Sequence, residues 1–237
     1  FKSPPNFELG SRYSVYLILS DGEFDLSQEI KVNITDTYGK LIGEEIYGSA
    51  IGDEFGWISS FNEQGNIIAV SSYKNNSNRG IVKVFSISTN SLSQLGGVLR
   101  GDNLGDFFGD RVELNDAGNI LAVGNPNYNN GYNLVTVYRY VSDTTWNIIG
   151  NNSGQTGDNF SSSRWYGFGH ALDFNGSGNT LVIGEPYYDT APGGGTNFGQ
   201  VKVYTYNSDN NWSSVVVPNS NGNGSGGSKA GHSVAIN

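Results

Sequence analysis

The feature that most constrains this chain is a long pattern that occurs three times in order and begins a fourth time. Each copy carries Gly-Asp, a Phe-Gly pair, an Asn-x-x-Gly-Asn turn, an apolar run and an alternating run that ends in an aromatic residue. The second glycine of the pattern stands at Gly56, Gly109, Gly169 and Gly231, at intervals of 53, 60 and 62 residues, although Ala230 replaces Phe in the last copy. A repeat of this length, made of short strand-like runs, predicts a β-propeller or a solenoid.

The runs inside each copy predict antiparallel strands. The turns occupy residues 62–66, 115–119 and 175–179; the apolar runs 67–70, 120–123 and 180–183; the alternating runs 82–85, 135–138 and 201–204. Alternation predicts a strand with one covered face, and an apolar run predicts a strand covered on both faces. We therefore expect an all-β fold of stacked four-stranded blades: three blades plus a partial fourth, forming a segment of a larger propeller. The expected repeat boundaries are 40–97, 98–151, 152–217 and 218–237 within a domain at 38–237.

Residues 1–37 differ from the repeats. Tyr13–Leu19 and Gln28–Ile34 read as two strands around an Asp-Gly turn, and such a hairpin needs a larger β-sandwich for stability. The segment resembles the C-terminal strands of a cadherin-like domain in its turn at Asp21 and its ending at Asp36. The resemblance implies that Asp21 and Asp36 bind Ca²⁺ between domains, although the usual downstream Asn-Asp-Asn is replaced by Thr37-Tyr38-Gly39.

The repeats resemble the FG-GAP type of β-propeller repeat found in integrin α-subunit heads and in large bacterial surface proteins. The resemblance rests on Phe108-Gly109, on the turn that follows, and on Gly124-Asn125-Pro126 with its counterpart Gly184-Glu185-Pro186. It implies a propeller of about seven blades and an extracellular or virion-surface location. It also implies Ca²⁺ loops, but here each turn offers at most one carboxylate, whereas Ca²⁺ takes six to eight oxygens. We therefore interpret these loops as plain turns, and Ca²⁺ is the one cofactor that the resemblances suggest.

Composition excludes several function classes. The net charge of −9 argues against nucleic acid and anionic membranes, which need clustered Lys and Arg. The absence of Cys excludes disulfides and thiol chemistry, and no apolar run is long enough to insert into a membrane. The chain begins without Met and ends at Asn237 inside an expected strand, so we expect a segment of a longer protein.

Residues that suggest chemistry also have plainer interpretations. His170 and His232 follow the repeat glycine, where other copies have Trp57 and Asp110, which favours a variable structural or surface position over a general base. One Asp per copy, at 53, 106 and 158, either caps a turn or binds a metal or partner; a catalytic pair would have to face one substrate. We therefore predict no catalytic residue and no enzymatic activity.

Two insertions point to partner binding. One carries Arg164, Trp165 and Tyr166, and the other carries Tyr187 and Tyr188. Insertions in repeat proteins form loops, and Arg, Trp and Tyr are the residues that dominate interfaces. The alternative is that Trp165 and Tyr166 fold back to cover their blade. Seven Asn-x-Ser/Thr sequences are glycosylation acceptors in a secreted protein: Asn33, Asn75, Asn151, Asn159, Asn175, Asn211 and Asn223.

Together these features predict a non-enzymatic extracellular adhesion or structural module of a large surface protein, fibre or appendage. Its partner would be a protein or glycan on a surface, or further copies of the same chain. Two alternatives remain open: a carbohydrate-binding propeller, and a targeting propeller of an enzyme whose catalytic domain lies outside this segment.

Overall fold

The computed structural model describes residues 12–20, 25–33, 45–88, 91–127, 132–150, 167–188, 198–207, 211–217, 227 and 229–237. The chain divides into two compact units, Phe1–Leu41 and Ile42–Asn237. In the first unit, β1 (Arg12–Ser20) pairs antiparallel with β2 (Asp25–Asn33) in a continuous register from Arg12–Asn33 to Ser20–Asp25. The two strands that the sequence predicts are therefore present. Asp21 and Asp36, the predicted calcium ligands, lie outside the described residues.

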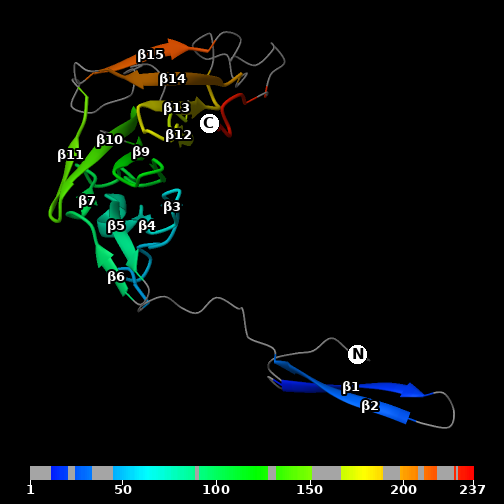
Figure 1. Cartoon of the computed structure of the whole chain (residues 1–237). Helices are drawn as coiled ribbons and strands as arrows, with labels where there is room; N and C mark the ends of the chain where they lie inside the picture. The colour runs from blue at the N-terminus through cyan, green and yellow to red at the C-terminus, as the bar shows by residue number, and fades with distance from the viewer. Residues whose placement is uncertain are drawn as a thin grey trace. The chain divides into compact units, whose positions relative to one another are not determined.

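The second unit consists of three antiparallel sheets that follow one another along the chain (Figure 1). We call them the first, second and third blades. The first contains β3 (Ser59–Phe61), β4 (Ile67–Ser72), β5 (Ile81–Ser88) and β6 (Ser91–Gln94), with β7 (Leu99–Arg100) paired to β5. A single turn, α1 (Asn75–Asn78), joins β4 to β5. The second contains β8 (Arg111–Leu114), β9 (Ile120–Asn127), β10 (Tyr132–Ser142) and β11 (Thr145–Ile148). The third contains β12 (Ala171–Phe174), β13 (Thr180–Glu185), β14 (Gln200–Tyr206) and β15 (Trp212–Val216).

Each blade contains a meander of four strands in chain order, to which β7 adds a fifth strand in the first blade, and this confirms the all-β fold built from propeller-type blades. The residues of the fourth repeat, 229–237, lie against the third blade through a parallel bridge between Gly199 and Ala230. The short first strands lie next to one another, because β8 contacts both β3 and β12.

The hydrophobic core lies between blades rather than within one. In β9, Leu121 and Val123 pack toward the first blade, whereas Ile120 and Ala122 pack toward the third. This explains why the run is apolar at every position: each face of the strand is covered by a different sheet.

The predicted turns form as expected. Asn62 Oδ1 accepts hydrogen bonds from the backbone N–H groups of Asn66 and Ile67, and Asn115 does the same for Asn119 and Ile120. Successive turns are also linked between blades, because the N–H of Glu63 donates to the carbonyl of Asp116. The Asn side chains therefore close the turns, as the sequence predicts.

The repeat glycine is a point of close approach between blades. Gly109 has φ +90°, and a Cβ there would lie 2.9 Å from Val82 Cγ2 of the preceding blade. At Gly169 it would lie 2.7 Å from Val135 Cγ2, and at Gly231 it would lie 2.3 Å from the carbonyl oxygen of Gln200. Each turn thus packs on the third strand of the blade before it.

This packing predicts different effects for one substitution at two matched glycines. Gly56 has φ +88°, but a Cβ there would meet no described atom within 4 Å. Gly56→Ala and Gly109→Ala therefore carry the same backbone strain, about 1–2 kcal/mol. Gly109→Ala also crowds Val82, which adds about 1–3 kcal/mol. Urea denaturation should show Gly109→Ala as the less stable variant, and equal losses would contradict this account of blade packing.

Candidate binding site

The Phe-Gly turns place side chains on one end of the blades in a fixed backbone geometry. The residue before each Phe, or before Ala230, is left-handed, with φ of 52°, 56°, 67° and 50° in the four copies. We call this end the turn face and define it by two positions of the turn. The residues before Phe or Ala are Glu54, Phe107, Gly167 and Lys229; those after the repeat glycine are Trp57, Asp110, His170 and His232. The left-handed conformation is uncommon for Glu and Lys and strained for Phe, so the turn imposes it.

The turn face of the first blade is aromatic. Trp57 is 51% exposed, and its ring lies 4.8 Å from that of Tyr73. Tyr73 in turn lies 5.9 Å from Phe107 of the next turn. Beside the rings, Lys74 Nζ pairs with Glu54 Oε1 at 2.5 Å, and this contact lowers the pKa of Glu54. The result is a surface that combines exposed aromatic rings with an ion pair.

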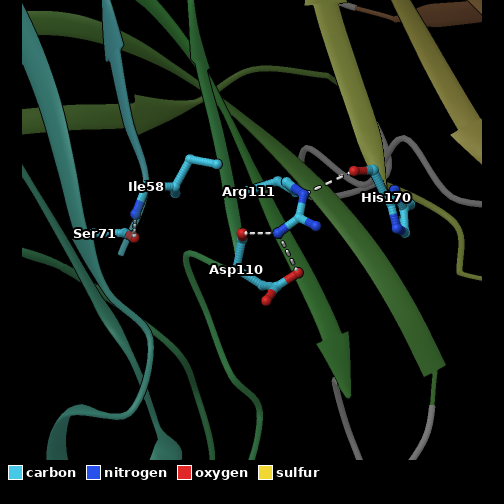
Figure 2. A network of polar contacts seen from close by, with 5 residues as sticks. All are labelled: Ile58, Ser71, Asp110, Arg111 and His170. Carbon is cyan, nitrogen blue, oxygen red and sulfur yellow. Dashed lines mark hydrogen bonds and ion pairs between the residues drawn. The ribbon is translucent and has the colours of Figure 1, made fainter. Parts of the chain in front are cut away.

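In the second blade, Arg111 links two repeats (Figure 2). Its Nε donates to the carbonyl oxygen of His170 at 2.8 Å, and its Nη1 donates to the carbonyl and to Oδ2 of Asp110, at 2.6 and 3.0 Å. The corresponding Ile58 of the first blade donates its backbone N–H to Ser71 Oγ instead. Arg111 therefore holds the third turn against the second blade and neutralises the Asp110 carboxylate.

The two histidines that the sequence favours as structural or surface residues lie together. The rings of His170 and His232 are 4.6 Å apart, and Tyr187 lies 6.2 Å from His170 edge-to-face. Burial lowers the pKa of His170, and the positive charges of Arg111 and His232 lower it further, against the opposing effect of Asp110. His170 is therefore neutral at pH 7. Its buried Nδ1 has no hydrogen-bond partner among the described residues.

A pocket of about 180 Å³ lies between the second and third blades, next to this histidine. Asp110 and Asn125 line it from the second blade, and Phe168, His170 and Tyr187 line it from the third. Asn125 is only 3% exposed, and within the described part of the chain its Oδ1 accepts no hydrogen bond. A buried acceptor left without a donor is costly, so this atom marks the pocket as a place where a donor is missing.

A second cavity, of about 450 Å³, lies at the opposite ends of the first strands, beside the Asn turns. Its acidic lining residues are Glu63, Glu113, Asp116 and Asp173. Burial raises the pKa of Glu113 to about 7, and the nearby Asp173 carboxylate contributes. However, Asp173 Oδ2 accepts the backbone N–H of Ile236 at 2.6 Å. Within the described ranges, no three His, Asp or Glu side chains gather so as to hold a metal ion.

The structure places only some of the residues that the sequence singles out. Arg164, Trp165 and Tyr166 lie outside the described residues, so their role stays a prediction. Tyr187 lines the pocket, while the neighbouring Tyr188 donates its N–H to the carbonyl of Glu185. The repeated Asp caps its turn where it is described: Asp53 Oδ2 accepts the N–H of Ala50, and Asp106 Oδ2 accepts that of Asn103.

The glycosylation acceptors also differ in their surroundings. Asn75 is 6% exposed, and its Nδ2, the atom to which a glycan would attach, donates to Ser49 Oγ and Asp53 Oδ2. A glycan there would replace one of these two N–H donors and would open the buried turn. Asn175 Nδ2 lies at an exposed turn, where it donates to Ser177 and Asn179. Asn151, Asn159 and Asn223 lie outside the described residues, and Asn33 is the last residue of β2.

Sequence reasoning missed Asn125, and it treated His170 only as a variable repeat position. Aligning the repeats gives the signal that finds Asn125. Its counterparts are Ser72, which donates to the carbonyl of Asp53, and Glu185, which accepts a hydrogen bond from Gln200 Nε2. Asn125 differs from both counterparts because its Oδ1 has no hydrogen-bond partner among the described residues. Whether a side chain has such a partner cannot be read from one sequence.

Comparison with known proteins gives only remote structural similarity. No protein-family model and no curated protein matches the chain. Among solved structures, a candidate 6-phosphogluconolactonase from Bacteroides uniformis is 14% identical with a TM-score of 0.43, covering 87% of this chain and 49% of that one. The β-propeller domain of the Trilobed protease from Pyrococcus furiosus is 13% identical with a TM-score of 0.39, covering 87% of this chain and 54% of that one. The chain thus spans about half the length of these structures. Nowhere among the described residues is there a helix long and apolar enough to cross a membrane.

The raised pKa of Glu113 makes a prediction about stability. The folded chain holds the proton more tightly than the unfolded chain, where the ordinary pKa is 4.5. The contribution of Glu113 to stability should therefore be full below pH 4.5 and fall as the pH rises to about 7. Glu113→Gln should remove this loss and unfold at higher urea concentration at pH 8, by an amount on the order of 1 kcal/mol.

The matched control is Glu63→Gln, which neutralises an exposed carboxylate on the rim of the same cavity. Its stability difference from the unmodified chain should be small at both pH 4 and pH 8. If Glu113→Gln and Glu63→Gln shift stability equally at pH 8, Glu113 is not the group that titrates between these values.

Proposed function

We propose that this chain is a non-enzymatic extracellular binding module of a larger surface protein, and that it presents the turn face to its partner. One observation carries the proposal: a constant backbone holds varied side chains. The left-handed position carries Glu54, Phe107, Gly167 and Lys229, with φ values between 50° and 67°. Catalysis would need one defined set of groups, whereas a binding surface uses a rigid scaffold with different side chains.

The chemistry of the turn face also supports binding. Trp57 is half exposed and stacked on Tyr73, and the ion pair of Lys74 and Glu54 lies beside it. Aromatic side chains that are rigid and partly exposed contribute most of the energy at interfaces. The strain at Phe107 favours the same interpretation, because a glycine would satisfy the turn at lower cost.

The proposal is tested with the chain immobilised on beads and measured for adhesion to intact cells of the organism that encodes it. Trp57→Ala and Phe107→Gly should each reduce bead adhesion severalfold. Phe107→Gly relieves the left-handed strain, about 1–2 kcal/mol, and loses one partly exposed ring contact. Its free energy of unfolding should therefore stay within about 1 kcal/mol of that of the unmodified chain.

The control is Phe61→Ser, which removes an exposed aromatic side chain, 53% accessible, at the other end of β3. Adhesion should be unchanged in this variant. Adhesion that drops equally in all three variants would mean nonspecific hydrophobic attachment, and no adhesion by the unmodified chain would reject the proposed function.

A further inference from the structure

We propose that the pocket between the second and third blades binds one ring of a neutral saccharide, whose hydroxyl groups hydrogen-bond to Asn125 Oδ1 and to His170 Nδ1. The inference rests on the proposed function, because it assigns a ligand class to one part of the turn face. It is carried by a comparison of the repeats, in which equivalent positions serve as internal controls.

The side chain of Asn125 is a buried hydrogen-bond acceptor for which the described residues provide no donor. The three repeats place a polar side chain at the position of Ser72, Asn125 and Glu185. Ser72 Oγ donates to the Asp53 carbonyl at 2.7 Å, and Glu185 Oε2 accepts from Gln200 Nε2 at 2.6 Å. Asn125 is equally buried, yet its Oδ1 has no donor within the described part of the chain. In the first and third blades, another group of the protein hydrogen-bonds to the side chain at this position. In the second blade, beside the pocket, no described group does so.

Gly167 leaves room for a ligand in the pocket. The left-handed position carries a side chain at Glu54, Phe107 and Lys229 but is Gly167 in the third repeat. Gly167 lines the pocket, and a Cβ there would lie 2.8 Å from Cδ2 of the Tyr187 ring. The missing side chain therefore opens the space at the same blade junction that holds the unsatisfied acceptor.

The polar groups of the pocket select the class of ligand. Asn125 offers an uncharged amide and His170 a neutral imidazole, so neither supplies a positive charge for an anion such as a phosphate or uronate. The one carboxylate, Asp110, is already paired with Arg111 at 3.0 Å, so it does not provide a net charge for an amine. A ligand with several neutral O–H donors remains.

The apolar side chains that line the pocket and the volume of the pocket narrow the class of ligand further. Phe168 and Tyr187 contribute ring surface to the pocket, and a pyranose has a C–H face that packs on aromatic rings. The volume of about 180 Å³ is below the roughly 300–1,000 Å³ of pockets for drug-sized ligands. The pocket therefore fits a single sugar ring, such as the terminal residue of a glycan.

The experiment measures binding of free monosaccharides to the whole chain at pH 7.5 by saturation-transfer NMR and calorimetry. The neutral probes are galactose, mannose, fucose and N-acetylglucosamine, and the charged counterparts are glucuronate and glucosamine. At least one neutral sugar should bind, and each charged counterpart should bind more weakly. Asn125→Leu should raise the Kd of the bound sugar at least tenfold.

Two further variants test whether a loss of binding comes from the pocket itself or from misfolding. Gly167→Phe places in the third repeat the residue found at Phe107 and should abolish binding by filling the pocket. Ser72→Ala changes the equivalent position of the first blade and should leave the Kd unchanged. The thermal transition of each variant, measured alongside, confirms that the chain is folded.

Failure of this inference is distinct from failure of the proposed function. If none of the four neutral sugars binds, or if Asn125→Leu and Gly167→Phe both leave the Kd unchanged while folded, the pocket assignment is wrong. Bead adhesion that still depends on Trp57 and Phe107 would then leave the proposed function standing. Stronger binding of glucuronate or glucosamine than of any neutral sugar would also overturn the assignment.

Discussion

The close approach of the turns at Gly109, Gly169 and Gly231 to the preceding blade is the constraint on which the rest of the second unit depends. At Gly231 a Cβ would lie 2.3 Å from the backbone oxygen of Gln200, and no side-chain movement relieves contact with backbone. The third strand of one blade and the turn of the next can therefore touch only where the turn has no side chain. This contact fixes the distance between blades and lets their apolar faces share a core.

Polar side chains complete the same junctions at the edges of the sheets. On the inner edge, Ser60 Oγ accepts the N–H of Leu114 from the next blade, and Asp173 does the same for Ile236. On the outer edge, Trp146 Nε1 donates to the carbonyl of Leu95, and Trp212 donates to that of Ile149. Unpaired strand edges are thus satisfied by the neighbouring blade. This accounts for Asp173 as a structural acceptor, and its negative charge helps to keep Glu113 protonated.

The sequence predicts this architecture well where the role of a residue depends only on its chemistry and on its neighbours in the chain. Asn115 closes its turn and Asp106 caps its own, because short polar side chains bond to backbone a few residues away. The apolar β9 is covered on both sides for an equally local reason. The predicted contacts of Trp165 and the calcium ligation by Asp21 and Asp36 stay predictions, because these residues lie outside the described ranges.

The pocket could not be predicted in the same way, because it arises from what is missing at two places far apart in the sequence. The sequence does not show that the Asn125 side chain lacks a hydrogen-bond partner. Gly167 looks like an ordinary turn glycine, because the sequence does not show that its counterparts Phe107 and Lys229 are left-handed as well. Non-glycine residues at that position show that the turn tolerates a side chain, so glycine there is not required by the backbone alone. In a repeat protein, the equivalent positions of the other copies show what the fold itself requires. A candidate site is therefore a blade junction at which one copy differs from the others at more than one position.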